Sequence, residues 1–120
     1  MKTLAVVEDN ADNRLLLNAI LEDRYRLVEY ETGAEALAGM KLVAPDGVLL
    51  DISLPGMDGV EVLQHIRADP QLRHLPVLAL TAHAMSGDRE RFLAHGFDDY
   101  LTKPIIDEAL LLDALTRAVG

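Results

Sequence analysis

The feature that most constrains the fold is an alternation of short apolar runs with longer stretches of helical spacing. The short runs are rich in aliphatic and β-branched residues, which is typical of buried strands. The first, third and fourth runs are almost wholly apolar, as in central strands of a parallel sheet covered on both faces. The predicted strands are Leu4–Val7, Arg26–Tyr30, Gly47–Leu50, Val77–Leu80 and Asp99–Leu101.

The stretches between these runs predict helices, because apolar residues recur in them at helical spacing. In the second stretch, Thr32 is followed three residues later by Glu35, which is the pattern of a capping box. In the first stretch, the apolar stripe is predicted to contain Leu15, Leu16, Ala19 and Ile20. The predicted helices are about Ala11–Glu22, one from Thr32, about Val60–Arg67, about Asp88–His95 ending at Gly96, and one after Pro104 that starts near Asp107.

This order of elements predicts an α/β fold with a parallel sheet and right-handed crossover connections. Five strand–helix units in 120 residues are too few for an eight-stranded barrel. We therefore predict an open doubly wound (βα)5 sheet in three α/β/α layers, with residues 1–120 forming a single domain. Gly47 occupies a strand position where a large apolar residue is common, which predicts weaker packing of the third strand.

The composition excludes several classes of function. The chain has no cysteine, so it has no disulfide, thiolate nucleophile or Cys-ligated metal. Its formal net charge of −9 argues against direct nucleic-acid binding, because like charges repel. Its apolar runs are shorter than the ~20 residues of a membrane span, and the N-terminus lacks the pattern of a signal peptide. We therefore predict a cytoplasmic protein with no membrane insertion.

Polar residues follow four of the predicted strands. Glu8 and Asp9 follow the first strand, Asp51 the third, Thr81 the fourth and Lys103 the fifth. Each has a structural explanation by itself, as a helix cap, a turn residue or a surface charge. Together they lie where ligands bind in open α/β sheets, beyond the carboxyl ends of the strands. The coincidence predicts a site at this edge of the sheet.

The residue types at this edge suit phosphoryl transfer. Three clustered carboxylates repel one another, and a hard divalent cation such as Mg²⁺ or Mn²⁺ relieves the repulsion through oxygen ligands. The Asp51 carboxylate would attack phosphorus in line and form an acyl phosphate. Lys103 would add a second positive charge, and Thr81 would donate its hydroxyl to a phosphoryl oxygen.

Four segments of the chain contain these polar residues together with their neighbours. They are VVEDN at Val6–Asn10, LLDISLPGMDG at Leu49–Gly59, LALTAHAM at Leu78–Met85 and DDYLTKPI at Asp99–Ile105. In sequence, order and spacing they resemble the receiver domains of two-component response regulators. The resemblance implies a flavodoxin-like fold with strand order 2-1-3-4-5.

The resemblance also implies residue roles. Asp51 matches the phosphoacceptor, Thr81 the switch hydroxyl and Lys103 the phosphate-binding lysine. The implied metal site contains Glu8, Asp9, Asp51 and the backbone carbonyl of Ser53. Tyr100 matches the aromatic switch residue, the bond between Lys103 and Pro104 is expected to be cis, and Ser53 and His83 are expected to tune the lifetime of the phosphate.

The implied function is a phosphorelay switch rather than an enzyme, since it would catalyse only its own phosphorylation and slow dephosphorylation. A histidine kinase or a histidine phosphotransfer protein would be the phosphodonor. The surface of the fourth helix, fifth strand and fifth helix would control a protein output partner. Tyr100, Phe92, His95 and Ala84–Asp88 are expected on that surface.

Two rival functions are weaker on these residues. A small aspartate-nucleophile phosphohydrolase usually has a second acid two residues after the nucleophile, and this chain has Ser53 there. A flavodoxin-like cofactor binder would need a phosphate loop after the first strand, where Glu8 and Asp9 would repel a phosphate. Within the receiver reading, we expect a stand-alone regulator, because Met1 begins at the first strand and the sequence ends with the fifth helix. A module from a hybrid histidine kinase or a multidomain regulator is the alternative.

Overall fold

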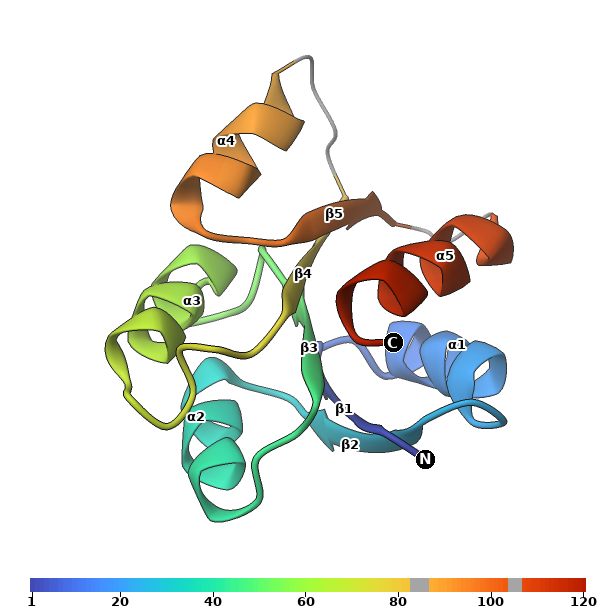
Figure 1. Cartoon of the computed structure of the whole chain (residues 1–120), viewed down its shortest axis with the longest axis horizontal. Coiled ribbons are helices and arrows are strands. Elements are labelled where there is room, and N and C mark those ends of the chain that lie inside the picture. The colour runs from blue at the N-terminus through green and yellow to red at the C-terminus, as the bar shows by residue number, and fades with distance from the viewer. Residues whose placement is uncertain (83–86, 104–106) are drawn as a thin grey trace.

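The computed structural model describes residues 1–82, 87–103 and 107–120 (Figure 1). Over these residues it contains a parallel sheet of five strands in the order β2-β1-β3-β4-β5. The predicted flavodoxin-like doubly wound topology and its strand order are therefore confirmed. The strands are β1 (Thr3–Val7), β2 (Arg26–Tyr30), β3 (Gly47–Asp51), β4 (Val77–Thr81) and β5 (Asp99–Thr102).

Helices cover both faces of the sheet, which gives the predicted three layers (Figure 1). Side chains alternate along the central strands, so Val48 and Leu50 of β3 enter one apolar core while Leu49 enters the other. The first core is closed by α2, α3 and α4, and the second by α1 and α5. The helices are α1 (Ala11–Leu21), α2 (Gly33–Leu42), α3 (Gly59–Ala68), α4 (Asp88–His95) and α5 (Glu108–Ala118).

Side-chain caps determine where four of the described helices begin. Thr32 accepts a hydrogen bond from the backbone N–H of Glu35 at 3.1 Å, which confirms the predicted start of α2. Asn10, Asp58 and Asp107 cap α1, α3 and α5 in the same way. Such caps satisfy backbone donors that the first helical turn leaves free. Each predicted strand and helix end lies within one residue of the observed one where a boundary was stated.

The predicted apolar stripe of α1 is wrong for Leu15, Leu16 and Ala19, which are exposed, and correct only for Ile20, which packs partly buried against the core. Leu15 is 69% exposed and Leu16 is 38% exposed, whereas Leu17 and Leu21 are buried against the sheet. The helix is oriented by Arg14, whose guanidinium donates to the Glu8 carbonyl at 2.8 Å. Because residues three and four apart share a helix face, a helix with Arg14 turned inward also buries Leu17 and Leu21.

Gly47 does not loosen β3, contrary to the prediction from sequence. It is buried, and a Cβ at this position would lie 2.5 Å from a methyl group of Val119 and 3.2 Å from Leu4. The side chain of Val119, which follows α5, therefore fills the space that a larger residue would occupy. This close approach packs the end of α5 against the start of β3.

Arg67, at the end of α3, connects three segments of the chain. Its guanidinium donates to the carbonyls of Gly96, Arg73 and Leu75 at 2.6 to 3.2 Å and forms an ion pair with Asp98 at 3.2 Å. The α3–β4 connection and the turn between α4 and β5 are thus tied to one helix end. Within the described part of the chain, none of the helices is long and apolar enough to cross a membrane.

Candidate functional site

The ends of β1 and β3 bring three acidic residues together. The two strands are paired neighbours, so Glu8 and Asp9 after β1 lie beside Asp51, the last residue of β3. One oxygen from each of the three carboxylates lies within 4.8 Å of the others. Among the described residues, this is a group that could hold a metal ion, as the sequence predicted.

Lys103 is the cation of this cluster. Its Nζ lies 2.9 Å from Oε1 of Glu8 and 3.1 Å from Oδ2 of Asp51. Since β4 lies between β3 and β5 in the sheet, the lysine side chain reaches across the end of β4. The Lys103 backbone is held by a hydrogen bond from its N–H to the carbonyl of Thr81 at 2.8 Å.

Thr81 is the last residue of β4 and is buried at 5% exposure. Asp51 pairs in register with Leu80, the residue just before it. The threonine therefore lies one residue beyond the level of Asp51 on the neighbouring strand. Ala82, which follows it, is exposed.

The three carboxylates differ in their access to solvent. Glu8 is fully buried and Asp51 is 1% exposed, whereas Asp9 lies at the surface. Burial raises the pKa of Glu8 above 4.5, against the bond from Lys103, and the nearby Asp51 raises it further. Burial alone would lower the pKa of Lys103, but its bonds to Glu8 and Asp51 outweigh this and hold that pKa above 10.5.

Glu8 has contacts that the sequence analysis did not identify. Its Oε1 accepts a hydrogen bond from Nδ2 of Asn13 at 3.1 Å, and its Oε2 accepts one from the Asn10 backbone N–H at 3.3 Å. Its own backbone N–H donates to the Tyr30 carbonyl at 3.0 Å, and its carbonyl accepts from Arg14. The sequence signal was available, because Asn10, Asn13 and Arg14 follow Glu8 at the start of a helix.

The Asp51 carboxylate is fixed from a second side. Its Oδ1 accepts a hydrogen bond from the Ser53 backbone N–H at 3.0 Å. Its Oδ2 contacts Lys103. The donor set of the site fits a hard divalent cation, because three carboxylates offer oxygen ligands and carry more negative charge than one lysine neutralises.

Of the described residues predicted on the surface of α4, β5 and α5, two lie inside instead. Tyr100 is partly buried and His95 and Gly87 are exposed, but Phe92 and Asp88 are buried at 3% and 5% exposure. The Phe92 ring packs against Phe97 and Tyr100, with centroids 5.9 and 5.7 Å away. The physical reason for the inward position is that an aromatic ring of this size stabilises the core when it is buried.

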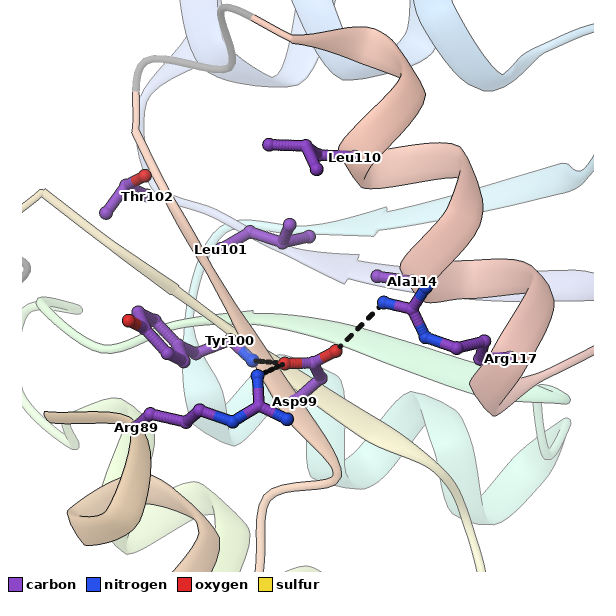
Figure 2. Close-up of a pocket in the computed structure, with 8 residues that line it drawn as sticks. All are labelled: Arg89, Asp99, Tyr100, Leu101, Thr102, Leu110, Ala114 and Arg117. Carbon is purple, nitrogen blue, oxygen red and sulfur yellow. Dashed lines mark hydrogen bonds and ion pairs between the residues drawn. The ribbon is translucent and has the colours of Figure 1, made fainter.

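A pocket of about 320 Å³ lies on the same surface, between α4, β5 and α5 (Figure 2). Asp99 at its centre pairs with Arg89 of α4 at 3.4 Å and with Arg117 of α5 at 3.5 Å. Figure 2 shows the two guanidinium groups approaching this carboxylate from either side. Leu110, which is 61% exposed, and Leu101 provide apolar lining.

Some predicted positions lie outside the described residues. They are His83, Pro104, for which a cis bond was expected, and the Ala84–Ser86 part of the expected readout segment. Of the remaining histidines, His65 and His74 are exposed, like His95. Ser53 is also exposed.

Comparisons with known proteins agree on one family. The model of the response regulator receiver domain matches residues 4–116. The histidine kinase BarA of Shigella flexneri is 42% identical over 109 residues, which are 90% of this chain and 12% of that protein. The polar-differentiation response regulator DivK of Brucella ovis is 41% identical over 105 residues, covering 87% of this chain and 85% of that protein.

A solved structure resembles the whole chain. It is the receiver domain of the sensor histidine kinase PA1611 from Pseudomonas aeruginosa, with a TM-score of 0.88 and 37% identity over 99% of this chain and 98% of that one. That crystal structure has a magnesium ion coordinated in its active site cleft. Receiver domains take phosphoryl groups from histidine kinases and act on output partners, and they are typically switches rather than catalysts. The sequence match, the fold and the acidic site together show that this chain belongs to the response regulator receiver domain family.

Proposed function

We propose that this receiver domain is switched by phosphorylation of Asp51, with Lys103 and Thr81 contacting the phosphate. The observation that supports this most is the position of the Asp51 carboxylate. It lies 3.1 Å from Lys103 Nζ and within 4.8 Å of carboxylate oxygens of Glu8 and Asp9. An ionised nucleophile beside a cation and a metal-binding group can attack phosphorus without a general base.

The cation of this site is proposed to be Mg²⁺, which Mn²⁺ could replace. Glu8, Asp9 and Asp51 would hold it, directly or through water, with the Ser53 carbonyl as a further oxygen. A bound divalent cation neutralises charge that develops on the phosphoryl oxygens. The support is the acidic cluster itself, together with the magnesium-bound receiver of PA1611.

The phosphoryl donor is proposed to be a phosphohistidine of a histidine kinase or of a phosphotransfer protein. An oxygen of Asp51 forms the new O–P bond while the N–P bond breaks, and the imidazole nitrogen keeps that electron pair. Lys103 is well placed for the product, because its ammonium already contacts the attacking carboxylate. The Thr81 hydroxyl would bond a phosphoryl oxygen and so favour one of two conformations.

The output is proposed to be a change at the surface of α4, β5 and α5 that alters binding of a protein partner. Two features support a coupling to the site. Thr81 ends β4 and Tyr100 lies on the neighbouring β5, and the Tyr100 ring packs against Phe92 of α4. A movement of Thr81 toward the phosphate would free space that the tyrosine ring could enter.

We propose that residues 1–120 act as one receiver unit, either as a stand-alone regulator or as part of a longer protein. The match to DivK spans 85% of that regulator, whereas the match to BarA spans 12% of that kinase. We further propose that the domain works in the cytoplasm, has no turnover beyond its own phosphorylation and dephosphorylation, and does not bind nucleic acid directly.

The test is incubation with Mg²⁺ and acetyl phosphate, followed by intact mass measurement. We expect the mass of one phosphoryl group to be added to the wild type and not to Asp51→Asn. Asp113→Asn, an exposed aspartate of α5, is the matched control and should gain the same mass. Addition of phosphate to Asp51→Asn would refute the assignment. If the protein instead hydrolyses a phosphate ester continuously and no phosphorylated protein accumulates, it is an aspartate-nucleophile phosphohydrolase.

Thr81→Ala separates phosphorylation from its output. We expect this variant to accept phosphate, because the nucleophile and Lys103 remain, but to lose the change at α4, β5 and α5. NMR amide shifts of Tyr100 and Leu101, with and without phosphorylation, measure that change. If phosphorylation changes these amide shifts in the variant as much as in the wild type, the Thr81 hydroxyl is not the coupling group. His83→Ala should change the dephosphorylation rate if His83 tunes the phosphate lifetime.

A further inference from the structure

The contacts of Glu8 point to a residue that supports the acidic site from the first turn of α1. We propose that Asn13 is a positioning residue that acts through Glu8 to set how tightly the site holds a divalent cation. This inference rests on the proposed function of the acidic cluster, and it adds a residue that does not itself contact the phosphoacceptor.

The geometry around Glu8 is unusual for a carboxylate. The side chain is fully buried, yet it lies beside a second buried carboxylate, that of Asp51. Such a pair is unfavourable unless donors compensate both charges. Lys103 is shared between the two, so Glu8 needs further donors of its own.

Asn13 supplies the side-chain donor that belongs to Glu8 and not to Asp51. Its Nδ2 lies 3.1 Å from Oε1, the same oxygen that accepts from Lys103 at 2.9 Å. The second oxygen, Oε2, accepts from the Asn10 backbone N–H at a longer 3.3 Å. The amide of Asn13 therefore fixes the rotation of the carboxylate and keeps Oε1 directed at Lys103.

The Asn13 side chain is itself held in place by the helix. The Asn13 backbone N–H donates to Oδ1 of Asn10, the cap of α1, at 3.1 Å. One turn of helix thus carries both the cap and the Glu8 contact. Arg14, the next residue, bonds the Glu8 carbonyl, so the main chain of Glu8 is also tied to α1.

The consequence concerns the cation more than the fold. If Asn13 is removed, Glu8 can rotate, and Lys103 is then free to move fully onto Asp51. A lysine bound more closely to Asp51 competes with a divalent cation for the same carboxylate. Groups that orient the residues of a metal site typically change metal affinity by about tenfold or more when they are removed.

The experiment measures the Mg²⁺ dissociation constant by NMR amide shifts in wild type and Asn13→Ala. We expect the dissociation constant to be about tenfold larger in the variant, which means weaker binding of Mg²⁺. Asn18→Ala is the matched control, since Asn18 lies further along α1 and its side chain forms no hydrogen bond within the described residues. It should bind Mg²⁺ like the wild type. Asn13→Leu, which keeps the bulk of the side chain, should repeat the loss and serves if the alanine variant does not fold.

A double-mutant cycle shows whether Asn13 acts through Glu8. In a Glu8→Gln background, the further change Asn13→Ala should have little effect on the constant, because no charge remains for Asn13 to orient. Equal affinity in wild type and Asn13→Ala, or an undiminished effect in the Glu8→Gln background, would overturn the proposal. The acetyl phosphate assay keeps the two claims apart. Wild type that binds Mg²⁺ but gains no phosphate refutes the switch and leaves the Asn13 result standing.

Discussion

Gly59→Ala should damage the site through the backbone, whereas the same change at Gly39 should not. Gly59 begins α3 directly against the end of β3. A Cβ there would lie 2.4 Å from the carbonyl oxygen of Asp51 and 2.7 Å from the Cα of Ile52. This is about 1 Å closer than the 3.4 Å at which ordinary contact begins, and backbone atoms cannot rotate away.

The expected cost of Gly59→Ala follows from this overlap. Overpacking a rigid contact typically costs about 1–3 kcal/mol, and the better helix propensity of alanine offsets up to about 1 kcal/mol of that. We expect a net loss of about 1–2 kcal/mol. For a chain of this size, that lowers the Tm by roughly 3–10 °C. The phosphorylation rate should fall as well, because β3 must shift at Asp51.

Gly39→Ala is the control, and we expect it to raise the free energy of unfolding where Gly59→Ala lowers it. A Cβ at this position in α2 would meet the Tyr30 hydroxyl at 2.4 Å. The Tyr30 ring is the end of a side chain, so it can turn aside, and alanine stabilises a helix interior by about 1 kcal/mol relative to glycine. Urea unfolding and the acetyl phosphate assay on both variants test the pair. A Gly59→Ala protein as stable and as active as wild type would refute the reasoning, as would an equal loss in Gly39→Ala.

Four further results are expected. Mg²⁺ at ten times its dissociation constant should stabilise the wild type by about 1.4 kcal/mol in thermal unfolding, and Asp51→Asn much less. Because the folded pKa of Lys103 lies above 10.5, its stabilisation is complete below pH 10.5 and is lost as pH rises through the folded value. In urea unfolding at alkaline pH, the free energy of unfolding of the wild type should therefore fall toward that of Lys103→Met. Because burial raises the pKa of Glu8 above 4.5, Glu8→Gln should be at least as stable as wild type at pH 7, with an advantage that vanishes as pH falls toward 4.5. Arg67→Met should lower the free energy of unfolding by about 1–3 kcal/mol, and Arg67→Lys should recover only part.

The fold could be predicted from the sequence because the apolar runs of the strands and the capping residues of the helices indicate the same order of elements. Buried parallel strands require apolar runs such as Val77–Leu80, and caps such as Thr32 mark helix starts in the same sequence. The position of the site was also predictable, since polar residues directly after apolar strands must meet at one edge. Glu8, Asp9 and Asp51 do meet there.

The failures come from packing, which a one-dimensional pattern does not contain. Three consecutive leucines at 15–17 allow several stripes on α1, and the choice depends on the bond from Arg14 to the Glu8 carbonyl. Phe92 was assigned to the surface because of its place on α4, but its depth depends on Phe97 and Tyr100. In each case the deciding contact joins residues whose neighbourhood only the folded chain defines.

The same limit explains why two adjacent acids in the sequence differ in the site. Glu8 and Asp9 are alike in charge, yet Glu8 is fully buried with its oxygens bonded to protein donors, and Asp9 is exposed. Alternation of side chains at the end of β1 directs the two carboxylates in different directions. A buried, bonded carboxylate holds Lys103 in place, and an exposed one can exchange water for a cation. Because the two acids are buried unequally, the end of β1 can hold Lys103 through Glu8 and still offer Asp9 to a metal ion.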